Sequence, residues 1–159
     1  MRILVAIACY GTKNLKYLQV LLTEYRRMPF KVDVVVLSNE PKDLGPDVEV
    51  VVGLPAKNPW SLPFGHKRLF AERLKHYDLF IYSEDDTPLT EKNIRLFLDA
   101  VRVLPPDHIA GFLRYETGPD GTRHVSSAHG RFHWVPESAR QIGGETFAQF
   151  SVGRSFRGR

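Results

Sequence analysis

Apolar residues follow two different spacings in alternation along the first two-thirds of the chain. Short continuous apolar runs, typical of buried strands, cover residues 2–9, 32–38, 48–52 and 79–82. Apolar residues that recur every three or four positions predict helices over about 13–27, with Thr12 as N-cap, over about 65–76, and from Thr90 onward. This alternation predicts an α/β fold with a mostly parallel sheet.

The remaining third of the chain has a weaker pattern. Ile109 to Tyr115 predicts one more strand, and the turn at 118–121 predicts that Thr122 to Ser127 returns as its hairpin partner. A short helix is expected near Glu137 to Ile142. We expect one domain over residues 1–150 and a disordered basic tail over residues 151–159.

Composition limits the classes of site, partner and cellular location that we expect for this protein. Cys9 is the single cysteine, which excludes an intrachain disulfide and a zinc cluster of thiolates. The net charge of +4 comes with no nucleic-acid-binding motif, so it indicates either a solvated basic surface or attraction to a phosphorylated substrate. The chain has no apolar run of membrane-spanning length and no signal peptide, and we expect a cytoplasmic protein.

Three consecutive carboxylates, Glu84, Asp85 and Asp86, follow the apolar run at 79–82. Like charges this close disfavour ionisation unless a cation binds there. In an extended backbone residues i and i+2 share a side, so Glu84 and Asp86 are expected to converge on one ion, with Asp85 turned away. Oxygen ligands favour Mg²⁺ or Mn²⁺. The alternative is an acidic turn that caps the next helix.

The order of the elements and the triplet Glu84-Asp85-Asp86 together resemble the nucleotide-sugar-binding half of GT-A glycosyltransferases. Some members of that family write its DXD motif with a leading Glu. The resemblance covers residues 2–115 and implies a three-layer α/β/α, Rossmann-like fold of the nucleotide-diphospho-sugar transferase type. It implies that Asp86 binds the metal, while Glu84 or Asp85 helps through water or contacts the ribose.

The same resemblance implies contacts to the nucleotide from other loops. The loop that would cradle the base and ribose contains Ala8, Cys9 and Tyr10, and Asn39 follows the second strand. Tyr10 is also consistent with a half-buried loop aromatic, and Asn39 with the start of a turn before Pro41.

Basic residues open the predicted helix at 65–76. Lys67 and Arg68 are the positions where the resemblance implies contacts to the nucleotide or its phosphates, and the helix N-terminus adds partial positive charge. The alternative for both is an ordinary surface charge.

The resemblance implies a metal-dependent glycosyltransferase, or its donor-binding half, that takes a nucleoside diphosphate sugar and an unknown glycan, lipid or protein acceptor. GT-A domains normally continue well past the triplet, so we expect a C-terminally truncated member, and turnover stays open. One alternative is a non-catalytic nucleotide-sugar-binding or interaction module. Another is an unrelated phosphotransferase or receiver-like domain that uses the triplet for Mg²⁺.

Overall fold

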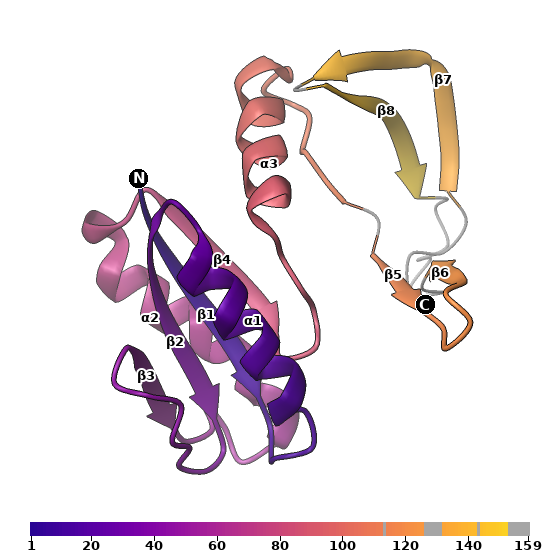
Figure 1. Cartoon of the computed structure of the whole chain (residues 1–159). Helices are drawn as coiled ribbons and strands as arrows, with labels where there is room; N and C mark the ends of the chain where they lie inside the picture. Colours follow the sequence, from indigo (N-terminus) through magenta and orange to yellow (C-terminus); the bar gives the residue numbers. More distant parts are fainter. Residues whose placement is uncertain (113, 126–131, 143, 153–159) are drawn as a thin grey trace, which may run out of the picture. The chain divides into compact units, whose positions relative to one another are not determined.

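The chain folds into two compact units, Met1–Glu91 and Lys92–Arg159. The computed structural model describes residues 1–112, 114–125, 132–142 and 144–152 (Figure 1). The expectation of a single domain over residues 1–150 stays a prediction.

The first unit is built on a four-stranded, all-parallel sheet with the strand order β3-β2-β1-β4. Its strands are β1 (Arg2–Cys9), β2 (Lys31–Ser38), β3 (Val48–Val52) and β4 (Leu79–Glu84). The continuous apolar runs therefore predicted these strands correctly, and the expectation of an α/β fold with a parallel sheet is confirmed.

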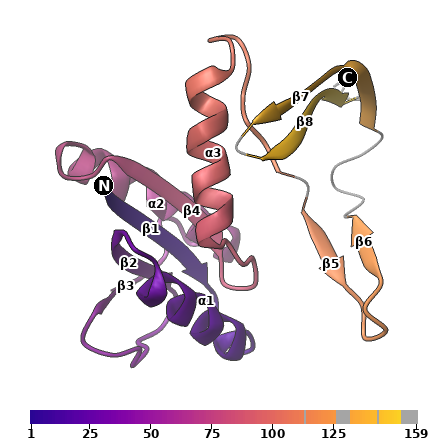
Figure 2. The ribbon, with the colours of Figure 1, turned by 45° about the horizontal axis from the view of Figure 1, so that its top comes forward.

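Helices cover both faces of this sheet. Helix α1 (Leu15–Arg27) joins β1 to β2, whereas η1 (Pro59–Phe64), α2 (Gly65–Arg73) and η2 (Leu74–His76) join β3 to β4. Figures 1 and 2 show α1 and α2 on opposite sides of β1. The helix predicted over 65–76 is thus α2 followed by one tighter turn.

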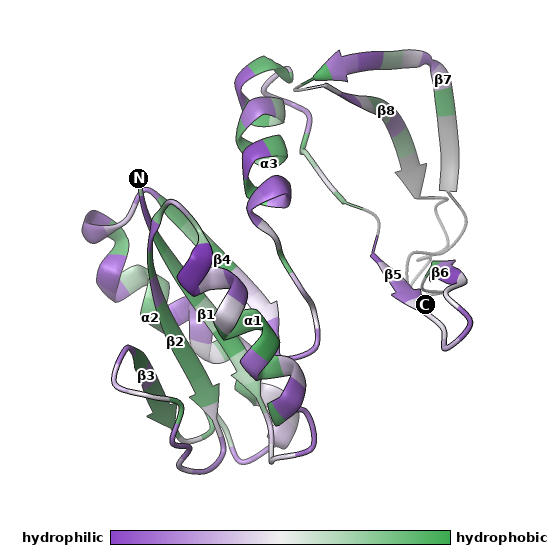
Figure 3. Ribbon diagram, viewed as in Figure 1, coloured by the Kyte–Doolittle hydropathy of each residue, from purple (hydrophilic) through white to green (hydrophobic). Residues whose placement is uncertain are grey.

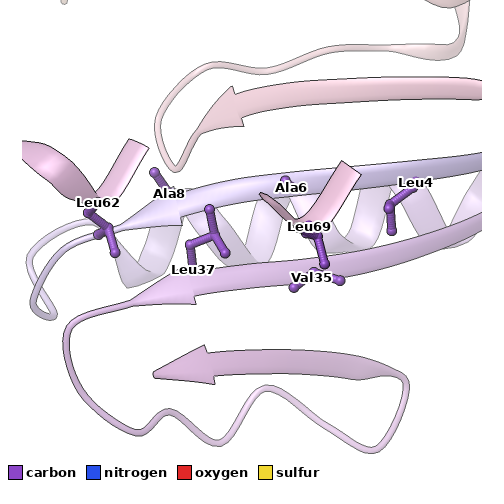
Figure 4. Close-up of a cluster of buried hydrophobic side chains, with 7 residues drawn as sticks. All are labelled: Leu4, Ala6, Ala8, Val35, Leu37, Leu62 and Leu69. Carbon is purple, nitrogen blue, oxygen red and sulfur yellow. The ribbon is translucent and has the colours of Figure 1, made fainter. Parts of the chain in front are cut away.

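Alternation along the strands explains how both faces become buried. One face of β1 and β2 meets Leu62 of η1 and Leu69 of α2, as Figure 4 shows. The intervening residues of β1 are also buried, and strand alternation directs them to the opposite face, the side of α1 in Figures 1 and 2; Leu18 and Leu22 of this helix are buried. Figure 3 shows the result as strands that are hydrophobic along their length beside a helix of mixed polarity.

Helix α1 begins later than the sequence predicted. Its N-cap position is Asn14 rather than Thr12, and the backbone oxygen of Thr12 accepts from the Leu15 N–H at 3.2 Å. The Asn14 side chain does not cap the helix, because its Nδ2 donates to Asp85 Oδ1.

The second unit contains α3 (Glu91–Val103), except for its first residue, and two antiparallel hairpins. The hairpins are formed by β5 (Tyr115–Thr117) with β6 (Arg123–Val125), and by β7 (Phe132–Ile142) with β8 (Glu145–Val152). The chain return after the turn at 118–121 is therefore confirmed over Arg123–Val125, but its partner is Tyr115–Thr117 rather than the predicted strand from Ile109, and residues 126–127 lie outside the described residues.

Three expectations for this unit need correction. The strand predicted over Ile109–Tyr115 is wrong over 109–112, which pair with no strand that the structure describes and where Ile109 is 94% exposed; residue 113 lies outside the described residues, and Tyr115 belongs to β5. The helix predicted near Glu137 to Ile142 is wrong because cross-strand pairing with β8 makes this segment part of β7. Of the predicted tail, residues 151–152 belong to β8, and 153–159 lie outside the described residues.

Among the described residues, no helix combines the length and the apolar character needed to cross a bilayer.

The packing of α1 on the sheet predicts which substitutions in this helix lower the free energy of unfolding most. Leu18 is fully buried, so Leu18→Ala should lower the free energy of unfolding by about 2–5 kcal/mol through lost burial and a cavity. Val20 lies on the same helix and is 63% exposed, so Val20→Ala should change it by less than about 0.5 kcal/mol. Urea denaturation followed by circular dichroism measures both, and equal effects would contradict this packing.

Candidate functional site at the carboxyl edge of the sheet

The ends of three parallel strands meet at one edge of the sheet. Cys9 of β1 lies in register with Ser38 of β2, and Ala8 lies in register with Glu84 of β4. The connection from β1 runs to one side, whereas the connection from β3 returns past β1 to β4. The carboxyl ends of β1 and β4 therefore flank the switch point of the topology, which is where open parallel α/β sheets bind ligands.

The acidic triplet begins in β4 and ends in a tight turn. Glu84 is the last residue of the strand, and its backbone oxygen accepts from the Thr87 N–H at 3.1 Å. The Ser83 hydroxyl donates to the Thr87 backbone oxygen at 3.0 Å and ties the turn to the strand. The alternation of side chains along β4 therefore ends at Glu84. The direction of the Asp86 side chain is set by the turn instead.

The three carboxylates have different surroundings. Glu84 and Asp86 are exposed, whereas Asp85 is only 6% exposed. Asp85 Oδ1 accepts from Asn14 Nδ2 at 2.8 Å, and the Asp85 N–H donates to the Ala8 backbone oxygen at 3.2 Å. Asp85 thus ties the turn after β4 to the start of α1, and its predicted contact with a ligand stays a prediction.

Two carboxylates of the triplet remain directed to solvent. Thr87 Oγ1 donates to Asp86 Oδ1 at 3.3 Å, which is a weak restraint on that side chain. Within the described part of the chain, no three His, Cys, Asp or Glu residues are grouped closely enough to hold a metal ion on their own. One or two exposed carboxylates are nevertheless the usual protein share of a Mg²⁺ site that is completed by water and phosphate.

Cys9 lies beneath this turn as a neutral thiol. Its side chain is fully buried, and burial raises the pKa of Cys9 to about 12, with further contributions from the hydrogen bond to Asp85 and from the charge of Asp85. A thiol in this state is neither a nucleophile nor a metal ligand near neutral pH. Ala8 is buried in the core as well, so only the backbone of these two residues borders the edge.

Side chains from the β2–β3 connection hold the loop after β1. Asn39 Oδ1 accepts from the Gly11 N–H at 2.7 Å, and Lys42 Nζ donates to the Gly11 backbone oxygen at 2.6 Å. Gly11 has φ 63°, a conformation that favours glycine. Tyr10, between Cys9 and Gly11, is 54% exposed.

The basic residues predicted to contact phosphate are engaged on α2. Arg68 Nε lies 2.7 Å from Glu72 Oε1, and this hydrogen bond raises the pKa of Arg68 further above its usual value. Lys67 Nζ lies over the Phe64 ring, 5.0 Å from its centroid. Both side chains would have to turn to reach a ligand at the edge.

The start of α2 also packs an aromatic pair against β4. The His66 ring lies 4.5 Å from the Tyr82 ring, and its Nδ1 is 2.6 Å from the Pro63 backbone oxygen. Burial raises the pKa of Tyr82 to about 12, and the charges of Glu84 and Asp85 add to this shift. His66 is therefore a packing residue whose ring contacts Tyr82 and the backbone of η1.

Sequence reasoning missed Asn14 and Lys42. Both Asn14 and Thr12 are residue types that cap helices, and the sequence predicts the N-cap at Thr12. Its partner Asp85 is 71 positions away, and pattern along the chain carries no information on that distance. Lys42 follows Pro41 in a polar loop and gave no signal of burial.

The second unit contains a cleft of about 440 Å³. Its polar lining includes Asp107, His108 and Arg140, and its apolar lining includes Leu104 and Phe147. His108 Nδ1 lies 2.8 Å from Asp107 Oδ1, a contact that lowers the pKa of Asp107. None of these residues was predicted as part of a site.

Comparisons with protein-family models, with curated proteins and with solved structures found no match to this chain.

The burial of Cys9 predicts its reactivity. At pH 8 the folded protein should react with a thiol reagent such as dithionitrobenzoate at least about a hundredfold more slowly than the protein in guanidinium chloride. The raised pKa keeps the thiol protonated in the folded state, so its contribution to stability should be lost as pH rises from 9 toward 12. The control is Cys9→Ala, whose stability should fall less steeply over that range. Rapid labelling of the folded protein would contradict the burial.

Proposed function

We propose that the unit Met1–Glu91 binds a nucleoside diphosphate sugar together with Mn²⁺ or Mg²⁺, as the donor-binding part of a GT-A-type glycosyltransferase. One observation carries the proposal. The switch point of a parallel sheet coincides with an acidic turn in which Glu84 and Asp86 are exposed while Asp85 is held by Asn14. An acidic turn that served only as a cap would not need this position.

The donor atoms at this turn fit a hard divalent cation. Asp86 supplies carboxylate oxygens beside the strand end, and Glu84 supplies a second carboxylate. The sulfur of Cys9 is buried and protonated, so softer metals gain no ligand from it. When bound, such a cation would neutralise the diphosphate and stabilise it as a leaving group.

The remaining residues would divide the donor between them. Tyr10 presents an exposed ring on which a nucleobase can stack. Arg68 and Lys67 are close in sequence to the helix start and bring the positive charge that a diphosphate requires. Arg68 would exchange Glu72 for a phosphate, and this costs little because the pair is exposed to solvent.

The contacts at this edge also favour the second candidate, a binding module without turnover. Glu40 pairs with Lys42 at 3.2 Å, and Asp85 is held by Asn14. Each of these two carboxylates therefore has a polar partner, which does not favour a role as catalytic base beside the proposed metal ligands. A product assay with labelled donor and candidate glycan, lipid or protein acceptors separates the transferase from the module.

The proposal predicts nucleotide binding that depends on the metal. In calorimetry, UDP- or GDP-sugars should bind in the presence of Mn²⁺, and Asp86→Ala should weaken this binding at least about a hundredfold because it removes the principal charged ligand. The matched control is Asp78→Asn, which alters a carboxylate at the opposite end of β4 and should leave the affinity within about twofold.

Two results would count against this function. Equal loss of affinity in both variants would place the nucleotide elsewhere or indicate general destabilisation. Tight Mg²⁺ binding with no response to any nucleotide would favour the phosphotransferase or receiver-like alternative.

A further inference from the structure

The β2–β3 connection grips both backbone polar groups of Gly11. Asn39 takes the Gly11 N–H at 2.7 Å, and Lys42 reaches the Gly11 oxygen at 2.6 Å. Both distances are short for neutral or charge-assisted hydrogen bonds, so two loops that are far apart in sequence are joined firmly. We name these three residues the Gly11 clamp.

Lys42 is buried in a way that a surface lysine is not. Its side chain is 3% exposed, and its Nζ lies 3.2 Å from Glu40 Oε1. The Ser38 hydroxyl donates to the Glu40 backbone oxygen at 2.7 Å and accepts from the Glu40 N–H at 3.2 Å, which fixes the backbone beside this pair. Burying an amine costs free energy unless it is paired and hydrogen-bonded, and here both conditions are met.

The clamp determines how Tyr10 is presented. Cys9 on one side of Tyr10 is the fully buried end of β1, and Gly11 on the other side is held by the clamp. The backbone of Tyr10 is thus fixed at both neighbours, while the residue as a whole is 54% exposed. An aromatic on a held backbone loses less conformational entropy when a planar ring stacks on it than one on a mobile loop would.

We propose that Lys42 is a positioning residue that acts through Gly11 to hold Tyr10 as a stacking surface for the nucleobase. This inference rests on the proposed function and adds a residue to it. It also reassigns Asn39, because its Oδ1 is used by Gly11 in the clamp. Base recognition at this loop then depends on stacking on Tyr10.

A double-mutant cycle tests the link between Lys42 and Tyr10. UDP binding in the presence of Mn²⁺ is measured for Lys42→Met, Tyr10→Ala and the double variant. Tyr10→Ala should weaken UDP about fivefold to a hundredfold, as loss of a stacked aromatic does. Lys42→Met should cause part of the same loss, and the double variant should bind no more weakly than Tyr10→Ala alone. Additive losses would overturn the proposal.

Two controls separate positioning from charge and from folding. Lys13 is an exposed lysine in the loop after β1 that contains Tyr10. Lys13→Met removes one positive charge, as Lys42→Met does, and should leave the UDP affinity within about twofold. Tyr10→Phe keeps the ring and should therefore lose less UDP affinity than Tyr10→Ala. Direct Mn²⁺ binding should be unchanged in Lys42→Met, because the proposed metal ligands lie after β4.

A measurement without ligand keeps the clamp testable apart from the function. Hydrogen exchange at the Gly11 amide should be at least about tenfold faster in Lys42→Met and in Asn39→Ala, and the latter serves if Lys42→Met does not fold. Unchanged exchange in both variants would overturn the clamp alone. Failure of the natural protein to bind UDP or GDP would overturn the nucleobase role together with the proposed function.

Discussion

Parallel pairing of β1 with β2 on one side and with β4 on the other is the constraint on which the site depends. The registers Cys9 with Ser38 and Ala8 with Glu84 bring three strand ends to the same level. Helix α1, which follows β1, and helix α2, which precedes β4, lie on opposite faces of the sheet (Figures 1 and 2). The loop after β1 and the loop after β4 therefore diverge at the strand ends. A slip of one residue would exchange the two buried faces of β1 and move Glu84 out of register with Ala8, so the core and the site are specified together.

The carboxylates at the carboxyl edge of the sheet differ in their partners and in their exposure to solvent. Asp85 is buried and bound to Asn14, Glu40 is paired with the buried Lys42, and Glu84 and Asp86 remain in water. The buried groups join the loops to each other, whereas the exposed ones are free to meet an external cation. In the proposed function, structural and ligand-binding roles thus fall on different carboxylates of this edge.

The sequence predicted those features that depend on local pattern. The apolar runs of β1 and β2 and the helical spacing of α1 were sufficient, because both faces of the sheet are buried and the signal is continuous. Burial of Asp85 was not predictable, since its partner Asn14 lies far along the chain. The segment near Glu137 was misassigned because pairing with β8 overrides its weak local preference.

The central claim is that a divalent cation and a nucleotide bind together beside Asp86. A crystal structure of the protein grown with Mn²⁺ and UDP, with anomalous data that locate manganese, tests it most directly. The account predicts a manganese peak roughly 2 Å from an Asp86 carboxylate oxygen and in contact with diphosphate oxygens. Manganese bound away from the turn after β4, or UDP bound at another surface, would contradict it.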